Sequence, residues 1–308
     1  ILNGNTPRTK SKSQLIAEMD SLYEYGWRGS LFIVDDNFIG NKKKLKAEIL
    51  PALIDWKQGK KYPFALCTEA SINLADDEEL LSLMANAGFN MVFIGVETPD
   101  EESLAECNKK QNRRRDMIAD IKRIQRSGME VQGGFIIGFD SDTASIFQKQ
   151  IEFIQKSGIV TAMVGLLQAP IGTRLYERLK GEGRLLSAFS GDNVDGNTNI
   201  IPKMNLDVLK NGYKTVVNYL YAPKNYYARV RTFLKEYKAP KIKVAFDFEY
   251  ILAFFRSIIQ LGIIDKERVH YWKLFFWTLF RRPKLFPLAI TFAIYGYHFR
   301  QVCNLHII

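Results

Sequence analysis

Glu97 is the first side chain in this sequence whose position suggests chemistry. It follows the apolar run at 91–94, which is typical of a buried strand in a parallel sheet, and it precedes Thr98-Pro99. Ligands meet α/β proteins at the carboxyl ends of parallel strands, so a carboxylate there is a candidate for binding or proton transfer. The alternative is a loop carboxylate that caps the next helix, whose acidic first turn is predicted at 100–102.

Further polar side chains follow the other predicted strands. They are Asp35, Asp36, Asn37, Glu69, Asp140 and Asp142. Together with Glu97 they exceed what the solvation of loops requires, so we predict a polar ligand site at this rim. The Asp-Asp-Asn run at 35–37 is compatible with a hard cation bound through oxygen ligands, and carboxylates at a helix start are the alternative.

The sequence lacks the residues of several common reactive centres. All three histidines lie beyond residue 269, which leaves the rim without one for a zinc site or a Ser-His-Asp triad. The three cysteines are far apart, have no Cys-x2-Cys spacing and fit reduced thiols better than a disulfide framework. Gly133-Gly134 open a predicted strand and do not follow one, so they do not form a dinucleotide-binding loop. A site on this rim therefore needs a reactive centre imported with a cofactor.

Five strand-then-helix units must position these residues. The predicted strands lie at 31–34, 64–67, 91–94, 131–138 and 160–167, and the helices between them at 42–59, 76–87, 101–110, 115–127 and 143–156. A first helix, capped by Ser13, precedes them, and Pro51 is expected to interrupt the second helix. Strand–helix alternation of this kind requires right-handed crossovers and a parallel sheet. We therefore predict an α/β fold, a partial TIM-like (β/α) barrel lacking its first strand, followed by a mostly α-helical C-terminal domain.

The predicted domains differ in composition. Residues 1–185 form the barrel-like core, 186–222 an irregular connection and a helix, and 223–308 a helical, basic and aromatic C-terminal domain. The whole excess charge of +10 lies in the last of these, which holds 15 Lys and Arg against 5 Asp and Glu. The basic character therefore says nothing about the chemistry of the barrel-like core.

The C-terminal domain also carries a possible membrane contact. Its uncharged run at 285–299 is too short for a spanning helix and contains Pro287. The aromatic residues at 272–277 stand beside a basic cluster of Arg281, Arg282 and Lys284, which is compatible with attachment to a membrane surface. The alternative, which the pattern favours, is that the aromatic rings pack inward and the basic groups are a solvated face.

The order of several motifs resembles that of radical S-adenosylmethionine (SAM) enzymes. In chain order they are Pro7-Arg8-Thr9-Lys10-Ser11, Phe32-Ile33-Val34-Asp35-Asp36-Asn37-Phe38, Thr68-Glu69-Ala70-Ser71, Gly95-Val96-Glu97-Thr98-Pro99, Gly133-Gly134-Phe135-Ile136-Ile137-Gly138-Phe139-Asp140 and Pro170-Ile171-Gly172-Thr173. The tail motifs Pro202-Lys203-Met204, Tyr226-Tyr227-Ala228-Arg229-Val230-Arg231 and Tyr295-Gly296-Tyr297-His298-Phe299-Arg300 are similar to the cobalamin-dependent subgroup that includes the hopanoid C-2 methylase. Each motif is loose, but their order and spacing are specific, and the resemblance covers almost the whole chain.

One feature of the family is missing. Its cluster motif, Cys-x3-Cys-x2-Cys, ends shortly before a loop like Pro7-Arg8, and this sequence begins at Ile1. The resemblance thus implies that the cysteines of a 4Fe-4S cluster, the first strand and a cobalamin-binding domain lie upstream of Ile1. Cys67 and Cys107 do not have the spacing to replace those ligands. The chain alone is expected to be inactive.

The resemblance also implies roles for the acidic residues. In the family, SAM lies across the strand ends, with its amino and carboxylate groups on the cluster iron. By matching position, Asp35, Asp36 and Asn37 would face the methionine amino group, and Glu69 would lie near the same end. Glu97 would accept hydrogen bonds from the ribose hydroxyls.

Four more cofactor-binding residues follow from the same resemblance. Lys109 would pair with the methionine carboxylate, with an exposed helix lysine as the alternative. Gly138 would let the backbone approach the adenine, and Leu167 and Gln168 would line its other side.

The function implied is radical chemistry on SAM. Reductive cleavage at the cluster would give a 5′-deoxyadenosyl radical that abstracts a substrate hydrogen, and cobalamin-dependent C-methylation of an unactivated carbon would follow. The partners implied are a small-molecule or lipid substrate and an electron donor protein, in the cytoplasm or peripherally at a membrane, and no nucleic acid is expected. The alternatives are a barrel enzyme of acid–base or magnesium chemistry, and a noncatalytic module that binds membrane surfaces or anionic partners.

Overall fold

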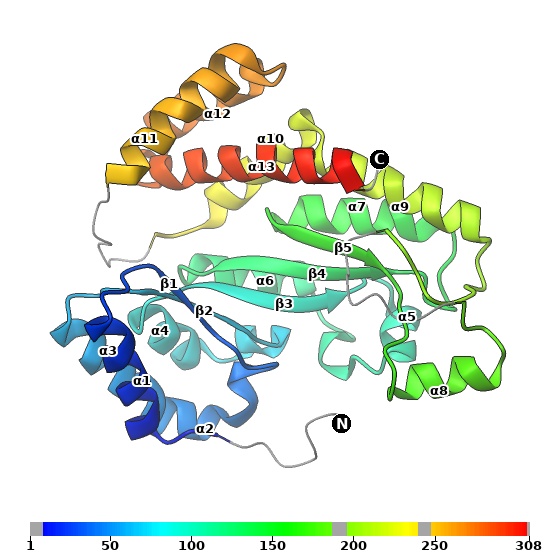
Figure 1. Cartoon of the computed structure of the whole chain (residues 1–308), viewed down its shortest axis with the longest axis horizontal. Coiled ribbons are helices and arrows are strands. Elements are labelled where there is room, and N and C mark those ends of the chain that lie inside the picture. The colour runs from blue at the N-terminus through cyan, green and yellow to red at the C-terminus, as the bar shows by residue number, and fades with distance from the viewer. Residues whose placement is uncertain (1–8, 187–195, 240–247, 307–308) are drawn as a thin grey trace. The chain divides into compact units, whose positions relative to one another are not determined.

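The computed structural model describes residues 9–186, 196–239 and 248–306, with the side chains of 248–250 and 306 left aside. Five parallel strands form one sheet in the order β1-β2-β3-β4-β5 (Figure 1). The strands are β1 (Ser30–Ile33), β2 (Ala65–Glu69), β3 (Phe89–Glu97), β4 (Glu130–Ile137) and β5 (Ala162–Leu166). Sequence order is thus also spatial order, as each strand-then-helix unit adds its strand beside the last. The predicted parallel α/β fold is confirmed.

Helices connect the strands and make up most of the other described residues. They are α1 (Lys12–Glu24), α2 (Lys42–Lys44), α3 (Leu50–Gly59), α4 (Glu78–Asn86), α5 (Glu101–Glu106), α6 (Met117–Arg126), α7 (Ser145–Ser157), α8 (Arg174–Gly181), α9 (Leu206–Tyr221), α10 (Pro223–Glu236), α11 (Phe248–Ser257), α12 (Arg268–Arg281) and α13 (Phe286–His306). The mostly α-helical C-terminal part is confirmed, and no helix among the described residues is both long and apolar enough to cross a membrane.

Of two local predictions about helices, the first needs correction. The cap of α1 is Ser11, and not Ser13, because Ser11 accepts from the backbone N–H of Gln14 while the Gln14 side chain accepts from the backbone of Ser11. This reciprocal capping box satisfies two N–H groups, which a cap at Ser13 could not do. The predicted irregularity at Pro51 is present, because the π-helical segment Leu45–Ile49 separates α2 from α3 and Pro51 follows it in the first turn of α3.

The described chain divides into two compact units. One contains residues 1–95, 119–132 and 236–250, and the other contains 96–118, 133–235 and 251–308. Strands β3 and β4 each contribute residues to both units. The domain boundaries expected at residues 185 and 222 stay a prediction.

In the second unit, the C-terminal helices attach to β5 and to one another through buried polar contacts. The Tyr221 hydroxyl of α9 donates to the carbonyl of Ala162 in β5 at 2.8 Å. The Tyr226 hydroxyl of α10 donates to the carbonyl of Phe292 in α13, also at 2.8 Å. Gly296 lies against the Tyr226 ring so closely that a Cβ there would be 2.3 Å from it. The packing of α10 on α13 therefore depends on the absence of a side chain at Gly296.

Candidate active site

Glu97 ends the central strand β3 in an unusual backbone conformation. Its φ of +65° lies in the left-handed region, which residues other than glycine seldom adopt. Residues held in such a conformation occur preferentially at functional sites. Two buried amides hold the backbone there. Gln150 of α7 donates to the carbonyls of Glu97, at 3.4 Å, and Ile136, at 3.1 Å, and Asn112 donates to the carbonyl of Val96 at 2.9 Å. The chain therefore fixes the direction of the Glu97 side chain by bonds on either side of it.

Lys109 lies beside Glu97. The Lys109 Nζ donates to Glu97 Oε1 at 2.5 Å, and the two side chains are 27% and 17% exposed. Lys109 follows α5 and caps the short turn Lys110–Asn112, so the same loop supplies both Lys109 and Asn112. The structure therefore brings two of the predicted cofactor residues into one partly buried ion pair.

The loop after β4 is built around Gly138 and Asp142. Gly138 has a φ of +112°, which an L side chain rarely adopts. The Asp142 Oδ2 accepts from the backbone N–H groups of Gly138, at 2.8 Å, and Phe139, at 3.1 Å, and its Oδ1 accepts from the Ser103 hydroxyl at 2.7 Å. Burial raises the pKa of Asp142, and these donors oppose the rise. Asp142 thus supports the loop and is not a free acid at the rim.

The other two predicted residues of this unit lie at the end of β5. Leu167 is buried in an apolar cluster with Phe139 and Ile200, and its carbonyl accepts from Thr198 at 2.6 Å. The Gln168 amide donates to the carbonyl of Asn197 at 3.4 Å. The side chains of Leu209 and Leu167 fill the space beside Gly138, because a Cβ added to Gly138 would lie 3.3 Å from Leu209 and 3.6 Å from Leu167. Gly138 and Leu167 are therefore neighbours, and their contact with adenine stays a prediction.

Asp140, expected as a rim acid, is neutralised by arginines. Arg184 donates to both of its carboxylate oxygens, at 2.6 and 3.0 Å, and Arg178 of α8 donates at 2.7 Å. Hydrogen bonds from Arg184 and then Arg178 hold the pKa of Asp140 well below its usual range, against the opposing effect of burial. Arg184 also donates to the carbonyl of Ile201 at 2.8 Å, so this network fastens the strand end to the chain beyond α8.

The remaining predicted residues belong to the first unit. Asp35, Asp36 and Asn37 are exposed and follow β1, and Glu69 is the half-buried last residue of β2. The Asn37 Oδ1 accepts from the backbone N–H and the hydroxyl of Ser71, at 3.1 and 3.2 Å. This contact joins the loops that follow β1 and β2. Each of the four residues lies at the carboxyl end of its strand, as predicted.

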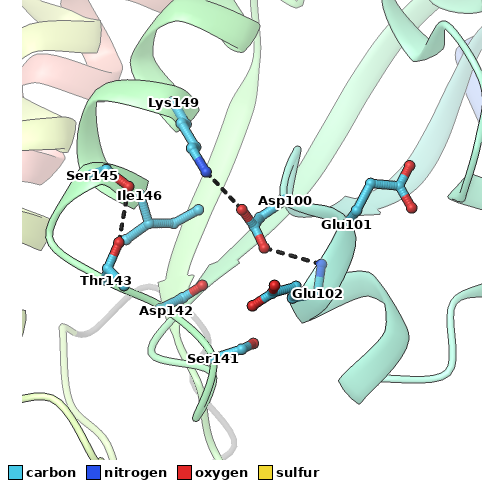
Figure 2. Close-up of a pocket in the computed structure, with 9 residues that line it drawn as sticks. All are labelled: Asp100, Glu101, Glu102, Ser141, Asp142, Thr143, Ser145, Ile146 and Lys149. Atoms are coloured by element: carbon cyan, nitrogen blue, oxygen red, sulfur yellow. Dashed lines mark hydrogen bonds and ion pairs between the residues drawn. The ribbon is translucent and has the colours of Figure 1, made fainter.

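A cavity of about 330 Å³ lies in the second unit, between the loops that follow β3 and β4 (Figure 2). Its lining includes Asp100, Glu101, Glu102 and Asp142, and Lys149 binds Asp100 at 2.8 Å across it. Asp100 also caps α5 by accepting from the backbone N–H of Glu102. None of the predicted cofactor residues lines this cavity.

The cysteines do not fit an iron–sulfur cluster. Cys67 is buried in β2 and donates to the carbonyl of Leu31, Cys107 ends α5, and Cys303 is buried in α13. Burial raises the pKa of each thiol, to about 11 for Cys303, whereas a metal ligand must be a thiolate. Among the described residues no three His, Cys, Asp or Glu side chains are grouped to hold a metal ion.

Sequence reasoning missed Gln150 and Asn112, which hold the Glu97 backbone, and the two arginines on Asp140. Gln150 gave a weak signal, because it stands among the apolar residues Ile146, Phe153 and Ile154 on the inner face of α7. A polar residue on a buried helix face has to find a buried partner. For Arg178 and Arg184, in a stretch rich in basic residues, the sequence offers no such signal.

Comparison with known proteins finds family models and relatives that match this chain. Residues 2–154 match the Radical SAM superfamily, and residues 173–307 match a domain of unknown function, DUF4070. An uncharacterised methyltransferase, sll1242, of Synechocystis is 40% identical over 307 residues, which are 98% of this chain and 57% of that protein. The hopanoid C-2 methylase of Rhodopseudomonas palustris is 38% identical over 200 residues, which are 65% of this chain and 37% of that protein. The chain thus spans only about half the length of these relatives, or less.

A solved structure agrees on the fold. The radical SAM methyltransferase TsrM of Kitasatospora setae, with cobalamin and a [4Fe-4S] cluster bound, superimposes with a TM-score of 0.52 at 12% identity. The match covers 94% of this chain and 56% of that one. The superfamily match, the named relatives and the parallel sheet agree, and the chain is therefore a member of the radical SAM superfamily of enzymes.

Proposed function

We propose that this chain is the SAM-binding core of a cobalamin-dependent radical SAM methylase, and that Glu97 receives the ribose of the nucleoside. The observation that carries the proposal is the left-handed backbone of Glu97 at the end of β3, with its carboxylate beside Lys109. A fixed carboxylate can accept hydrogen bonds from both hydroxyls of a diol. Methylation is supported by the relatives that are named as methyltransferases.

Ligand binding would exchange the Glu97–Lys109 ion pair for two contacts with SAM. Glu97 would turn to the ribose hydroxyls, and Lys109 to the methionine carboxylate. Because the two side chains are partly buried, each would meet its new partner with little loss of solvation. When bound, SAM supplies a sulfonium whose carbon–sulfur bond is cleaved by one electron to begin hydrogen abstraction.

The other predicted residues keep the roles that the family resemblance implies, each within its own unit. Asp35, Asp36 and Asn37 would face the methionine amino group near Glu69, and the segment from Gly138 together with Leu167 and Gln168 would approach the adenine. Because the cysteines are dispersed and protonated, the proposal assigns the 4Fe-4S cluster and cobalamin to a part of the protein outside these 308 residues. An electron donor protein would reduce the cluster.

The names of the relatives support a small-molecule or lipid substrate. Two of them are named for methylation of a hopanoid and of a bacteriochlorophyllide. We therefore extend the proposal to a lipid-like substrate for this chain.

The replacement Glu97→Gln tests the role of Glu97 in the 308-residue chain. We expect it to weaken SAM binding about 10- to 100-fold, because hydrogen bonds to a charged acceptor contribute about 1.5–3 kcal/mol. The measurement is equilibrium dialysis with labelled SAM, with adenosine and 2′-deoxyadenosine as competitors. The wild-type chain should prefer adenosine about tenfold, and the variant should lose this preference.

Glu102→Gln is the matched control, since Glu102 is an exposed carboxylate only five positions away. It should leave SAM binding within about twofold. Unchanged SAM binding by the Glu97 variant would contradict the proposal, as would a preference for adenosine that survives in it. Circular dichroism of each variant separates loss of binding from loss of folding.

Reconstitution with iron and sulfide tests the assignment of the cluster to another part of the protein. We expect the chain, treated anaerobically, to show no electron paramagnetic resonance signal of a reduced 4Fe-4S cluster and no cleavage of SAM. The reason is that the three thiols are separate and their pKa values are raised by burial. A cluster signal lost on Cys107→Ser would contradict the assignment.

A further inference from the structure

An apolar surface covers the segment at 251–284, which runs from α11 through the turns at Ile258–Ile264 into α12. Of the 22 large apolar side chains that are exposed among the described residues, nine lie in this short segment. They are Leu252, Phe255, Ile259, Ile263, Ile264, Val269, Phe276, Leu279 and Phe280. We call these nine residues the hairpin face. Clustering of this kind marks an interaction surface, whereas single exposed apolar residues do not.

The inner side of the same segment is well packed. Phe254 of α11 stacks on Phe275 of α12 at 6.2 Å, and the hydroxyls of Ser257 and Tyr271 are hydrogen-bonded at 3.0 Å. Phe286, at the start of α13, lies 4.8 Å from the Phe275 ring. Since these contacts hold α11 and α12 together, the side chains of the hairpin face are not needed to pack the two helices against each other. The hairpin face is a second apolar side that residues 9–186, 196–239 and 251–305 leave exposed.

The aromatic residues of the hairpin face form a row along α12. Phe276 stacks between Trp272, at 5.5 Å, and Phe280, at 6.3 Å, and Phe280 is 77% exposed. The apolar positions 252, 255, 259 and 263 recur at helical spacing and form a similar row on α11 and the turns after it. Rows of this kind on two helices that pack together make an extended apolar surface.

The charges around the hairpin face have one sign. Between residues 251 and 284, all of which the structure describes, there are seven Lys and Arg and two Asp and Glu. The acids are not exposed, because Glu267 is buried against Arg300 and Asp265 is half-buried. Six of the seven bases are exposed: Arg256, Lys266, Arg268, Lys273, Arg281 and Lys284. The surface is therefore suited to a partner that is apolar inside and anionic at its boundary.

We propose that the hairpin face docks on the surface of a bilayer that contains anionic lipid. Aromatic and aliphatic side chains enter the boundary between headgroups and acyl chains, and the surrounding bases bind lipid phosphates. With 14 residues, α12 is shorter than the roughly 20 residues that a spanning helix needs, so it lies in the plane of the interface. The occupant is a membrane surface because apolar contact and positive charge occur together on the same face.

Vesicle co-sedimentation of the 308-residue chain tests the proposal. Binding to vesicles of phosphatidylglycerol and phosphatidylcholine should be at least about tenfold tighter than to phosphatidylcholine alone, and salt should weaken it. The double variant Phe276→Ala/Phe280→Ala and the triple variant Lys273→Ala/Arg281→Ala/Lys284→Ala should each weaken binding about tenfold or more. These side chains are exposed, and thermal unfolding checks that the variants fold.

The matched control is on α9, where Lys210, Lys214 and Tyr219 are exposed. Their replacement by Ala should leave vesicle binding within about twofold. The proposal is overturned if the wild-type chain does not bind anionic vesicles, or if the control weakens binding as much as the hairpin variants. It is also overturned if sedimentation velocity shows a dimer that Phe276→Ala/Phe280→Ala dissociates while vesicle binding is unchanged.

Discussion

Replacement of Arg229 by Ala is expected to lower the free energy of unfolding by about 3–5 kcal/mol, a cost typical of breaking a buried charged contact. Arg229 of α10 is fully buried, and its guanidinium donates to the carbonyls of Leu220, at 2.8 Å, and Val160, at 3.2 Å, and to Gln155 Oε1 at 3.1 Å. It thus joins α7, α9 and the start of β5. Without it, two buried carbonyls and the partly buried Gln155 Oε1 lose a donor, and a cavity opens.

The replacement Arg229→Lys tests whether the positive charge or the planar shape of the guanidinium group provides the stabilisation. Burial lowers the pKa of Arg229, so charge alone carries a desolvation cost at this position, and the benefit comes from the planar group that reaches several acceptors at once. We expect the lysine variant to lose about 2 kcal/mol, since one ammonium group cannot reach all three acceptors. Urea unfolding followed by circular dichroism is the measurement.

Lys235→Ala, at an exposed position of the same helix, is the control and should change the free energy of unfolding by less than about 0.5 kcal/mol. If Arg229→Lys is as stable as the wild-type chain, the positive charge is what matters and the argument from geometry is wrong.

Asp140→Asn is expected to have the second-largest effect on stability, about 2–3 kcal/mol at pH 7. The Asp140 side chain is only 9% exposed and accepts from Arg178 and Arg184. Asn keeps the shape but removes the charge, which leaves Arg184 with Glu182 at 2.8 Å and Arg178 with more distant acids at 3.5 Å. Arg184→Ala should be more damaging than Arg178→Ala, because Arg184 is 14% exposed and Arg178 is 40% exposed.

The effect should depend on pH in a defined direction. The pKa of Asp140 in the folded chain is depressed by Arg184 and Arg178, below an unfolded value near 3.9. The stabilisation is therefore fully present above about pH 5, and it is lost as the pH falls from about 4 toward the folded pKa. The difference between the wild-type chain and Asp140→Asn should shrink over that range. Urea unfolding at pH 7, 5, 4 and 3 measures it.

Glu177→Gln on α8 serves as the control, because Glu177 is exposed and should contribute less than about 0.5 kcal/mol at any of these pH values. A difference between the wild-type chain and Asp140→Asn that stays constant from pH 7 to pH 3 would show that the carboxylate charge is not the source of the stabilisation.

Much of the fold was predictable because it is encoded in short stretches of sequence. The buried run at 91–94 lies in β3, and the polar residues after each predicted strand do lie at strand ends. The boundaries were less accurate. The third strand was predicted at 91–94, and β3 runs from Phe89 to Glu97, since pairing with a neighbouring strand can extend a strand beyond its apolar run.

The candidate site was predictable only in part. The pattern located Glu97 and the family resemblance implied Lys109, but their contact at 2.5 Å depends on the turn after α5. It also treated Asp140 and Asp142 as rim acids, although arginines neutralise the first and backbone N–H groups bind the second. A side chain's type and its place after a strand do not reveal which partners distant segments bring to it.

The sequence by itself determined the parallel α/β class, the order of its strands and the superfamily to which the chain belongs. These properties rest on local periodicity and on motif order, which the chain carries whatever its tertiary contacts. Only the tertiary structure decided which polar groups are exposed to a ligand and which are used for support. Gln150, Arg184 and Arg229 act on residues more than 40 positions away, and such partners meet only when the chain is packed.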